Sequence, residues 1–336
     1  MLLFFMLRAR LLRLIRPFCV SAILCALCVC GCHRGSSGGG ATKIILQADW
    51  YPQPEHGGYY TAIAKGFYAA EGLDVSIQPG GPYLSVEKQV SAGAAQFGMS
   101  SSDRILESIA DGQPLVAVMA TMQRDPQGVM VRKDSPIHSF PDLNGHTVAI
   151  KTGSTWWTYI AKRYQLSGVH EVPAMMNVAN FVADPNYVQQ AFATSEPFFA
   201  KQAGIETRVM LTSDAGYNPY RVAFTTRDFL AQHPDTVAAF VRASIHGWRE
   251  YLADPSAAHA VIAKLNPALN PQWMQFTWQA LRDGHFVDGD DPSGAQLGQM
   301  TADRWTTMYQ QLLEIKVIDK QLDPATAYTL QFVGGK

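Results

Sequence analysis

Short apolar runs recur along residues 43–225, and most are followed by a segment whose apolar residues return every three or four positions. The apolar runs predict strands at residues 43–47, 73–78, 95–99, 115–122, 129–132, 147–151, 171–175, 187–194, 208–211 and 221–225. The segments between them predict helices, as at residues 58–70, where Tyr60, Ile63 and Phe67 share one face. Strands that alternate with helices predict an α/β fold, with parallel sheets covered by helices on both faces.

Beyond residue 225 the strand pattern gives way to helices, and the spacing predicts them at residues 234–253, 256–264, 271–279 and 294–314. The apolar strands at 129–132 and 221–225 flank the middle block, so we expect them to be crossovers between two α/β lobes. Ligands usually bind where such domains meet and at the carboxyl ends of parallel strands. The pattern therefore predicts two lobes, two crossover strands, a helical C-terminal tail and a solute cleft between the lobes.

The N-terminal residues have the pattern of an export signal. Four arginines between Arg8 and Arg16, with no acid, precede an apolar run at residues 18–27. Small residues then stand before Cys32, as in the lipobox of bacterial lipoproteins. We therefore predict a signal peptide at residues 1–31 and lipidation of Cys32. The alternative is an uncleaved membrane anchor, but the uncharged stretch is short against the roughly 20 residues that a spanning helix needs.

Composition narrows the chemistry of the remaining chain. All five cysteines lie within residues 1–32, so disulfides, thiolate metal sites and cysteine nucleophiles are excluded from the body. Removing the signal takes away four arginines and no acid, which leaves a net charge near −5 and makes nucleic acid an unexpected partner. Residues 32–41 are rich in Gly and Ser and predict a flexible tether. The nine histidines lack the paired spacing of a zinc site.

Four segments together resemble a known family: DWYPQPEHGGYYTAIAKGFYAAEGLDVSI at 49–77, AGAAQFGMSSSDRI at 92–105, LNGHTVAI at 143–150 and TSEPFFAKQAG at 194–204. The chain resembles the periplasmic binding proteins that serve thiamine-pyrimidine precursors, sulfonates, nitrate and related solutes. The resemblance implies a type II two-lobed binding protein, with lobe 1 at residues 42–131 plus 225–336 and lobe 2 at 132–224. It further implies hinge closure around a solute, no cofactor, and delivery by a monomer to the permease and ATPase of an ABC importer.

An enzyme is the main alternative class, because a pyrimidine synthase of fungi shares the architecture that the resemblance implies. That enzyme carries a lysine, a histidine four residues later and a cysteine-rich cluster. By the resemblance, Ser100 stands here in place of the lysine and Arg104 in place of the histidine, and the body has no cysteine. We therefore expect a binding protein and no enzyme. A sensor domain that feeds a signalling partner is the third alternative.

Candidate binding residues of lobe 1 follow the carboxyl ends of the predicted strands: Trp50, Gln53, His56, Tyr59, Ser101 and Thr121. An indole at Trp50 would stack on a heteroaromatic ring for about 0.5–1.5 kcal/mol beyond its area burial, or it could simply cap the sheet. The amide of Gln53 and the ring of His56 could bond the edge of such a ring, although a lone histidine is often structural. Ser101 either holds a polar ligand atom or caps the following helix.

Candidate binding residues of lobe 2 and the second crossover are Ser154, Thr155, Trp156, Asn177, Glu196, Tyr217 and Tyr220. Glu196 bears most directly on the ligand, because the resemblance places an acid here in pyrimidine binders. Its alternative role is to complement the positive end of the helix that starts at Pro197, for about 0.3–1 kcal/mol. A carboxylate in the cleft disfavours sulfonate or nitrate and favours neutral or basic heterocycles. We expect a thiamine-pyrimidine precursor, with a flavin or an anion as alternatives.

Overall fold

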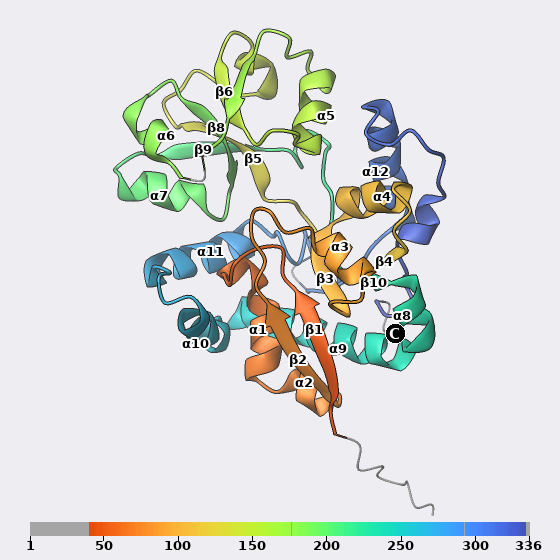
Figure 1. Cartoon of the computed structure of the whole chain (residues 1–336). Coiled ribbons are helices and arrows are strands. Elements are labelled where there is room, and N and C mark those ends of the chain that lie inside the picture. Colours follow the sequence, from red (N-terminus) through yellow and green to blue (C-terminus); the bar gives the residue numbers. More distant parts are fainter. Residues whose placement is uncertain (1–39, 176, 292, 334–336) are drawn as a thin grey trace, which may run out of the picture. The chain divides into compact units, whose positions relative to one another are not determined.

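Two five-stranded sheets organise the computed structural model, which describes residues 40–175, 177–291 and 293–333 (Figure 1). The first sheet has the order β2-β1-β3-β10-β4. Its strands are β1 (Thr42–Gln47), β2 (Leu73–Gln78), β3 (Phe97–Ser101), β4 (Leu115–Met122) and β10 (Arg221–Thr226). The predicted export signal and Cys32 lie outside the described residues, as does the predicted tether apart from Gly40 and Ala41.

The first sheet is mixed, so the prediction of purely parallel sheets is wrong. Strand β1 runs parallel to β2 and β3, with Thr42 opposite Leu73. Strand β10 lies between β3 and β4 and runs antiparallel to both, so that Ala223 stands opposite Met99 and Met119. The reason is the path of the chain. It leaves this sheet for the other lobe at the end of β4 and returns from that lobe at the start of β10, so β10 runs in the opposite direction.

The second sheet has the order β7-β6-β8-β5-β9 and is also mixed. Its strands are β5 (Gln127–Arg132), β6 (Thr147–Ile150), β7 (His170–Pro173), β8 (Val188–Phe192) and β9 (Thr207–Leu211). Strand β6 is parallel to β7 and β8, whereas β5 is antiparallel to β8 and β9. The chain passes from the first sheet to the second between β4 and β5, and it returns between β9 and β10.

Helices α1 (Gly57–Ala64) and α2 (Phe67–Ala70) replace the single helix predicted at residues 58–70. Gly66 separates them with a φ of 72°, a left-handed conformation that an α-helix cannot contain. Helix α1 packs on the long helix α9 (Pro234–Ala253). A Cβ at Gly247 would lie 2.2 Å from the carbonyl oxygen of Gly58, so this glycine allows the two helix backbones to approach closely.

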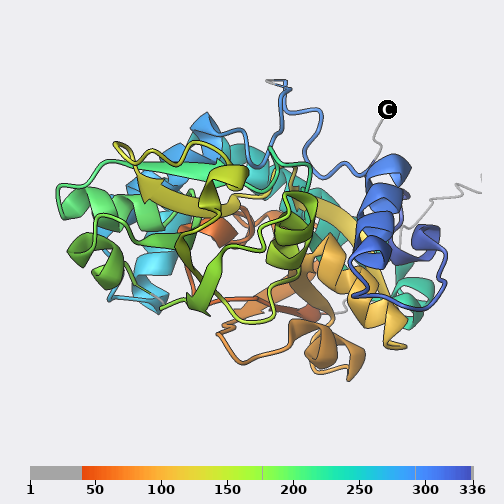
Figure 2. The same cartoon turned by 90° about the horizontal axis from the view of Figure 1, so that it is seen from above.

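The remaining helices of the first lobe are the 3₁₀ helix η1 (Pro54–His56), α3 (Val86–Ser91), α4 (Ser102–Ala110), α8 (Arg227–Gln232), α10 (Ser256–Leu265), α11 (Pro271–Asp283), α12 (Ala302–Glu314) and the 3₁₀ helix η3 (Pro324–Ala327). The helix predicted at 294–314 begins only at Ala302, where the Thr301 hydroxyl accepts the N–H of Arg304. Gly298, with a φ of 81°, instead bonds strand β4 through its carbonyl. Both views show α12 beside α4 (Figures 1 and 2).

Short helices accompany the second sheet: the 3₁₀ helix η2 (Phe140–Leu143), α5 (Thr155–Arg163), α6 (Ala179–Ala183) and α7 (Glu196–Gln202). Two large apolar clusters hold the described residues together. One lies between the first sheet and helices such as α1 and α9, and it contains Phe97, Phe240 and Trp248. The other includes residues of both sheets, such as Ala117 and Val148, together with Trp305 of α12. The two lobes therefore share part of their apolar packing.

Candidate functional site

The loop after β1 holds the first candidate residues at the carboxyl edge of the first sheet. Trp50 is half-buried, and its ring meets the ring of Tyr51 edge-on with centroids 5.6 Å apart. The Trp50 carbonyl accepts the N–H of Gly80 at 2.9 Å, which ties this loop to the loop after β2. Gln53 is also half-buried, just before η1. Part of the indole and part of the amide therefore remain accessible at this edge.

His56 is buried and paired, which matches the structural role considered for it. Its Nε2 lies 2.9 Å from Oδ1 of Asp49. Desolvation would raise the pKa of Asp49, but the hydrogen bond and charge of His56, with the nearby charge of Arg221, hold it below its ordinary value. Nδ1 of His56 has no hydrogen-bond partner among the described residues. The pair fixes the ring where η1 meets α1.

Three of the candidate tyrosines are packed in the interior with their hydroxyls engaged. The hydroxyl of Tyr59 lies 2.6 Å from that of Thr121, and both residues are buried. Tyr217 is fully buried and donates to Oδ2 of Asp103 at 2.7 Å. Tyr220 is also buried, and its hydroxyl accepts the N–H of Thr301. Within this conformation these side chains position other groups and present little surface to a solute.

Ser101 lies between β3 and α4 and is buried. Its hydroxyl donates to Oδ1 of Asp103, which also accepts the backbone N–H of Arg104 at 2.9 Å. Because Asp103 also receives the hydroxyl of Tyr217, its carboxylate connects β3 to the loop that precedes β10. The Ser101 side chain is therefore bonded to this carboxylate instead of capping the helix.

The turn between β6 and α5 holds the candidates of the second lobe. Ser154 donates to the carbonyl of Lys151 at 2.6 Å, and Thr155 donates to Oε1 of Glu107 on α4 at 2.8 Å. Trp156 is half-buried and meets Trp157 edge-on. Asn177 lies apart from this turn, is exposed, and accepts the N–H of Ala179. The structure thus brings Thr155 into contact with the other lobe, whereas Asn177 stays outside that contact.

Glu107 is an unusually weak acid in this position. Burial and the nearby carboxylate of Asp103 raise its pKa to about 7, although the hydrogen bond from Thr155 opposes the rise. A carboxyl group with this pKa is close to half protonated at neutral pH. It can therefore accept the Thr155 hydroxyl in either protonation state.

Glu196 forms the first residue of α7 and is only partly exposed. Its Oε2 accepts the backbone N–H of Phe192 at 2.8 Å, so it closes the turn between β8 and α7. Burial raises the pKa of Glu196 to about 7 against the effect of its backbone hydrogen bonds, with a further contribution from Glu55. Oε1 forms no hydrogen bond with another described residue. At least one oxygen of this carboxyl group is thus used by the fold.

A second cross-lobe contact joins Glu55 of η1 to Thr194, which follows β8. The Thr194 hydroxyl donates to Oε1 of Glu55, and the Thr194 carbonyl accepts the hydroxyl of Thr277 on α11 at 2.8 Å. Burial raises the pKa of Glu55, although the hydrogen bond from Thr194 opposes this. Aromatic side chains of α7 and α11 extend the contact, since the ring centroids of Phe198 on α7 and Phe276 on α11 lie 5.6 Å apart. The lobes therefore touch on this side through both polar and apolar groups.

Arg221, at the start of β10, connects the two segments through which the chain crosses between lobes. One of its terminal nitrogens lies 3.0 and 3.3 Å from the two carboxylate oxygens of Asp125, and its guanidinium lies 5.2 Å from the centre of the Phe192 ring. Burial would lower the pKa of Arg221, but Asp125 and Asp49 raise it, so the side chain stays charged. Its charge is compensated within the protein.

Sequence reasoning did not select Glu55, Glu107, Thr194 or Arg221. Thr194 had a usable signal, because it is the first polar residue after the apolar run of β8. The others lie in segments where charged residues are common, and only their partners in the fold distinguish them.

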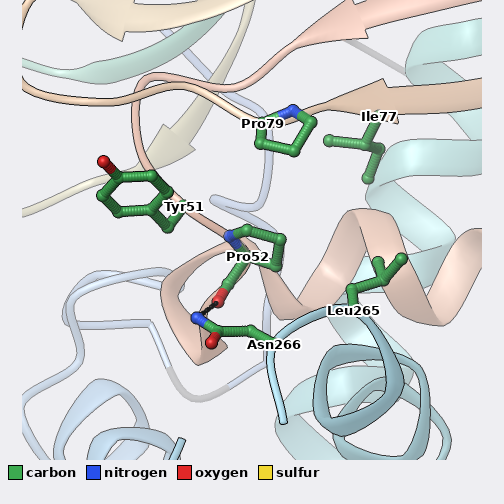
Figure 3. Close-up of a pocket in the computed structure, with 6 residues that line it drawn as sticks. All are labelled: Tyr51, Pro52, Ile77, Pro79, Leu265 and Asn266. Carbon is green, nitrogen blue, oxygen red and sulfur yellow. Dashed lines mark hydrogen bonds between the residues drawn. The ribbon is translucent and has the colours of Figure 1, made fainter. Parts of the chain in front are cut away.

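A pocket of about 490 Å³ lies beside the Trp50 loop (Figure 3). Its lining residues are Tyr51, Pro52, Ile77, Pro79, Leu265 and Asn266, and we call it the flank pocket. It is formed by the loops after β1 and β2 and by the end of α10, all within the first lobe. The pocket is therefore next to the candidate residues, because its lining residue Tyr51 is in ring contact with Trp50.

Two features are absent from the part of the chain that the structure describes. In residues 40–175, 177–291 and 293–333, no group of three or more His, Cys, Asp and Glu side chains is arranged to hold a metal ion. Over the same part of the chain, no helix is both long enough and apolar enough to cross a membrane.

Comparison with known sequences identifies relatives over most of the chain. The pattern described as NMT1/THI5 like matches residues 53–258. Riboflavin-binding protein RibY of Chloroflexus aurantiacus is 26% identical over 309 residues, which cover 87% of this chain and 86% of RibY. The 4-amino-5-hydroxymethyl-2-methylpyrimidine phosphate synthase of Legionella pneumophila is 23% identical over 87% of this chain and 92% of its own length.

Comparison with solved structures gives the same architecture. The periplasmic aliphatic sulphonate-binding protein SsuA of Escherichia coli matches with a TM-score of 0.65 at 15% identity, over 89% of this chain and 95% of SsuA. At this identity the likeness concerns the fold alone. It confirms the predicted two-lobed α/β fold of periplasmic binding proteins.

Proposed function

The chain belongs to the NMT1/THI5-like family, as its sequence predicted, and we propose that it is the extracytoplasmic solute receptor of an ABC importer. Its solute is a small heteroaromatic nutrient that binds between the two lobes and leaves chemically unchanged. The family and the two-lobed fold support solute binding. Permease and ATPase subunits are the expected protein partners, and the receptor acts as a monomer without a cofactor.

The receptor is an exported lipoprotein in this proposal, held at the membrane by a lipid on Cys32 after removal of residues 1–31. The arginine-rich start, the short apolar run and the small residues before Cys32 support this assignment. Replacing Cys32→Ala should move the protein from the membrane fraction to the soluble fraction of the cell envelope. A variant protein that stays in the membrane fraction would show that the apolar run itself is the anchor.

The acidic character of the inter-lobe face is the observation that carries the choice of solute. Glu55 and Glu107 come to this face from lobe 1 and Glu196 from lobe 2, while the charge of Arg221 is paired with Asp125. An anionic solute would either meet these carboxyl groups with like charge where they are ionised, which costs several kcal/mol where water is excluded, or hold them protonated. A ring with amino or ring N–H donors would instead find carboxyl acceptors.

Trp50 supplies the flat surface that a ring needs, since it is half-buried at the carboxyl edge of β1 beside Gln53. Glu196 offers its Oε1 to an exocyclic amine or ring N–H from the other lobe. A thiamine-type aminopyrimidine and a flavin both carry such donors. The name of RibY, which is similar over most of this chain, supports the flavin.

Enzymatic pyrimidine synthesis is the second candidate, because several relatives are named for it. In this chain, however, Ser100 donates to Glu87 at 2.5 Å, and Arg104 lies 3.8 Å from the same carboxylate. These are the positions at which the resemblance places the lysine and histidine of the synthase. A binding role therefore agrees better with the residues present.

Calorimetry with the purified protein tests the proposal. We expect binding of 4-amino-5-hydroxymethyl-2-methylpyrimidine or riboflavin, loss of that binding in Trp50→Ala, and no change in the control Tyr83→Ala, whose ring is fully exposed. Binding of taurine and nitrate alone would refute the heteroaromatic solute. Release of a new pyrimidine from protein incubated with pyridoxal phosphate, iron and a histidine donor would show an enzyme.

A further inference from the structure

The flank pocket is built from fixed parts. Gly80 donates its N–H to the carbonyl of Trp50, and the side chain of Gln47 donates to the carbonyls of Gln78 and Pro79 at 3.2 and 3.1 Å. A Cβ at Gly80 would lie 2.3 Å from the Ala48 carbonyl oxygen, so only glycine lets the two loops lie this close. The loops after β1 and β2 therefore form one rigid wall.

Helix α10 closes the other side of the pocket. Asn266, directly after the helix, donates its side-chain N–H to the carbonyl of Pro52 at 3.2 Å, as Figure 3 shows. This bond holds Leu265 opposite Ile77 and Pro79. The pocket is thus preformed in the first lobe and does not depend on closure of the lobes.

The lining is apolar and uncharged, with Asn266 as its polar member. Leu265 is 54% exposed and Tyr51 is 50% exposed, so two large apolar side chains face solvent at the rim of one concave site. Exposed apolar surface gathered around a hollow is typical of binding sites, whereas single exposed apolar residues are common everywhere. The volume of about 490 Å³ also lies within the range of small-molecule sites.

The pocket adjoins the proposed solute site through two neighbouring rings. Trp50 provides the proposed stacking surface, and Tyr51, in edge-on contact with it, lines the pocket. A single ring stacked on Trp50 covers the stacking surface and leaves the flank pocket unfilled. A solute that occupies both must be longer than one ring and must carry its polar donors at one end and an apolar edge at the other.

We propose that the flank pocket is a subsite of the solute site and takes the apolar benzenoid edge of a fused-ring heteroaromatic solute. This inference rests on the proposed function and narrows its solute class from single rings to fused rings. The polar ring lies against Trp50, toward the carboxyl groups of the inter-lobe face. A charged appendage is excluded from the pocket because no lining residue can neutralise it.

The test compares two probes, riboflavin as the fused ring and 4-amino-5-hydroxymethyl-2-methylpyrimidine as the single ring. Leu265→Arg fills the pocket with a long side chain at the end of α10, where the helix dipole favours a positive charge. Leu330→Arg is the matched control, since Leu330 is 45% exposed and does not line the pocket. Leu265→Met keeps the apolar volume.

Leu265→Arg should weaken riboflavin binding by about tenfold or more and change aminopyrimidine binding by less than about twofold. Leu330→Arg should bind riboflavin as the unchanged protein does, and Leu265→Met should retain more of the riboflavin affinity than Leu265→Arg. If Leu265→Arg loses equal affinity for both probes, or loses none for riboflavin, the subsite is overturned and the proposed function stands. The same holds if the unchanged protein binds only the aminopyrimidine. Unchanged affinities combined with weaker stimulation of the importer ATPase would make the pocket an importer contact and also overturn the inference. An unchanged protein that binds neither probe refutes the proposed function itself.

Discussion

Glu107 offers a direct test of the cross-lobe carboxyl groups, because it titrates in an accessible range. It lies on α4 of the first lobe and accepts the hydroxyl of Thr155 at the start of α5 in the second lobe. Burial, with the nearby charge of Asp103, raises its pKa from 4.5 to about 7. The substitution Glu107→Gln keeps an acceptor for Thr155 and removes the titration.

The sign of the effect follows from proton binding. Between pH 4.5 and pH 7 the folded protein holds a proton on Glu107 that the unfolded chain has already released. The contribution of this group is therefore full below pH 4.5, and the free energy of unfolding falls as the pH rises to about 7. Above that range both states are ionised, and the folded state bears the cost of a desolvated charge.

The magnitude comes from the same shift. A rise from 4.5 to about 7 corresponds to about 3 kcal/mol if it is fully expressed. Because Glu107 is partly exposed, we expect about 1–2 kcal/mol after solvent screening. Glu107→Gln should therefore equal the unchanged protein at pH 4.5 and exceed its stability by this amount at pH 8.

Urea unfolding at a series of pH values measures the difference between the two proteins. Glu206→Gln is the control, since it makes the same change at an exposed glutamate. A difference between Glu107→Gln and the unchanged protein that does not vary with pH would refute the reasoning. So would a variant that loses stability at pH 8, because the charge of Glu107 would then be stabilising.

Three further predictions concern the site and the packing that holds it. Glu196 has a pKa of about 7, so its ionisation should strengthen binding of an amine-bearing ring as the pH rises from 6 to 8. Calorimetry should show that the affinity of Glu196→Gln does not change over this range. If the affinities of the variant and the unchanged protein vary with pH in parallel, the carboxyl group is not part of the site. Thr277→Val leaves the Thr194 carbonyl without its cross-lobe donor and should lower the urea-measured stability by about 1–3 kcal/mol, whereas no loss would mean that water replaces it. Gly247→Ala forces α9 away from Gly58 and should cost about 1–3 kcal/mol or more in thermal unfolding, and an unchanged melting temperature would contradict the close approach.

The strand positions could be predicted from the sequence because the strands are short apolar runs. All eight residues of β4 are buried, and the apolar run at 115–122 predicted its bounds. The direction of β10 could not be predicted, since hydrophobic periodicity is the same for parallel and antiparallel neighbours. The break at Gly66 was missed for a related reason, because an isolated glycine inside a helical pattern is often tolerated.

The candidate site could be predicted only as a set of positions at strand ends. Its decisive contacts join residues far apart in the chain: 139 positions separate Thr194 from Glu55, 48 separate Thr155 from Glu107, and 96 separate Arg221 from Asp125. No local pattern carries such information. Aromatic residues posed the opposite difficulty, because a tyrosine of the interior cannot be told from a tyrosine of the site by its sequence.

The cross-lobe contacts share a chemistry that bears on solute choice. Two of them pair a carboxyl group with a hydroxyl group, Glu55 with Thr194 and Glu107 with Thr155, and burial raises the pKa of both carboxyl groups. Carboxyl groups that are partly protonated can meet across the lobes with little repulsion. In the proposed function, separation of the lobes would hydrate these groups and favour their ionisation, which would prepare acceptors for a solute rich in N–H donors. An anion would have to enter against that ionisation, so the carboxyl groups of these cross-lobe contacts would also select against it.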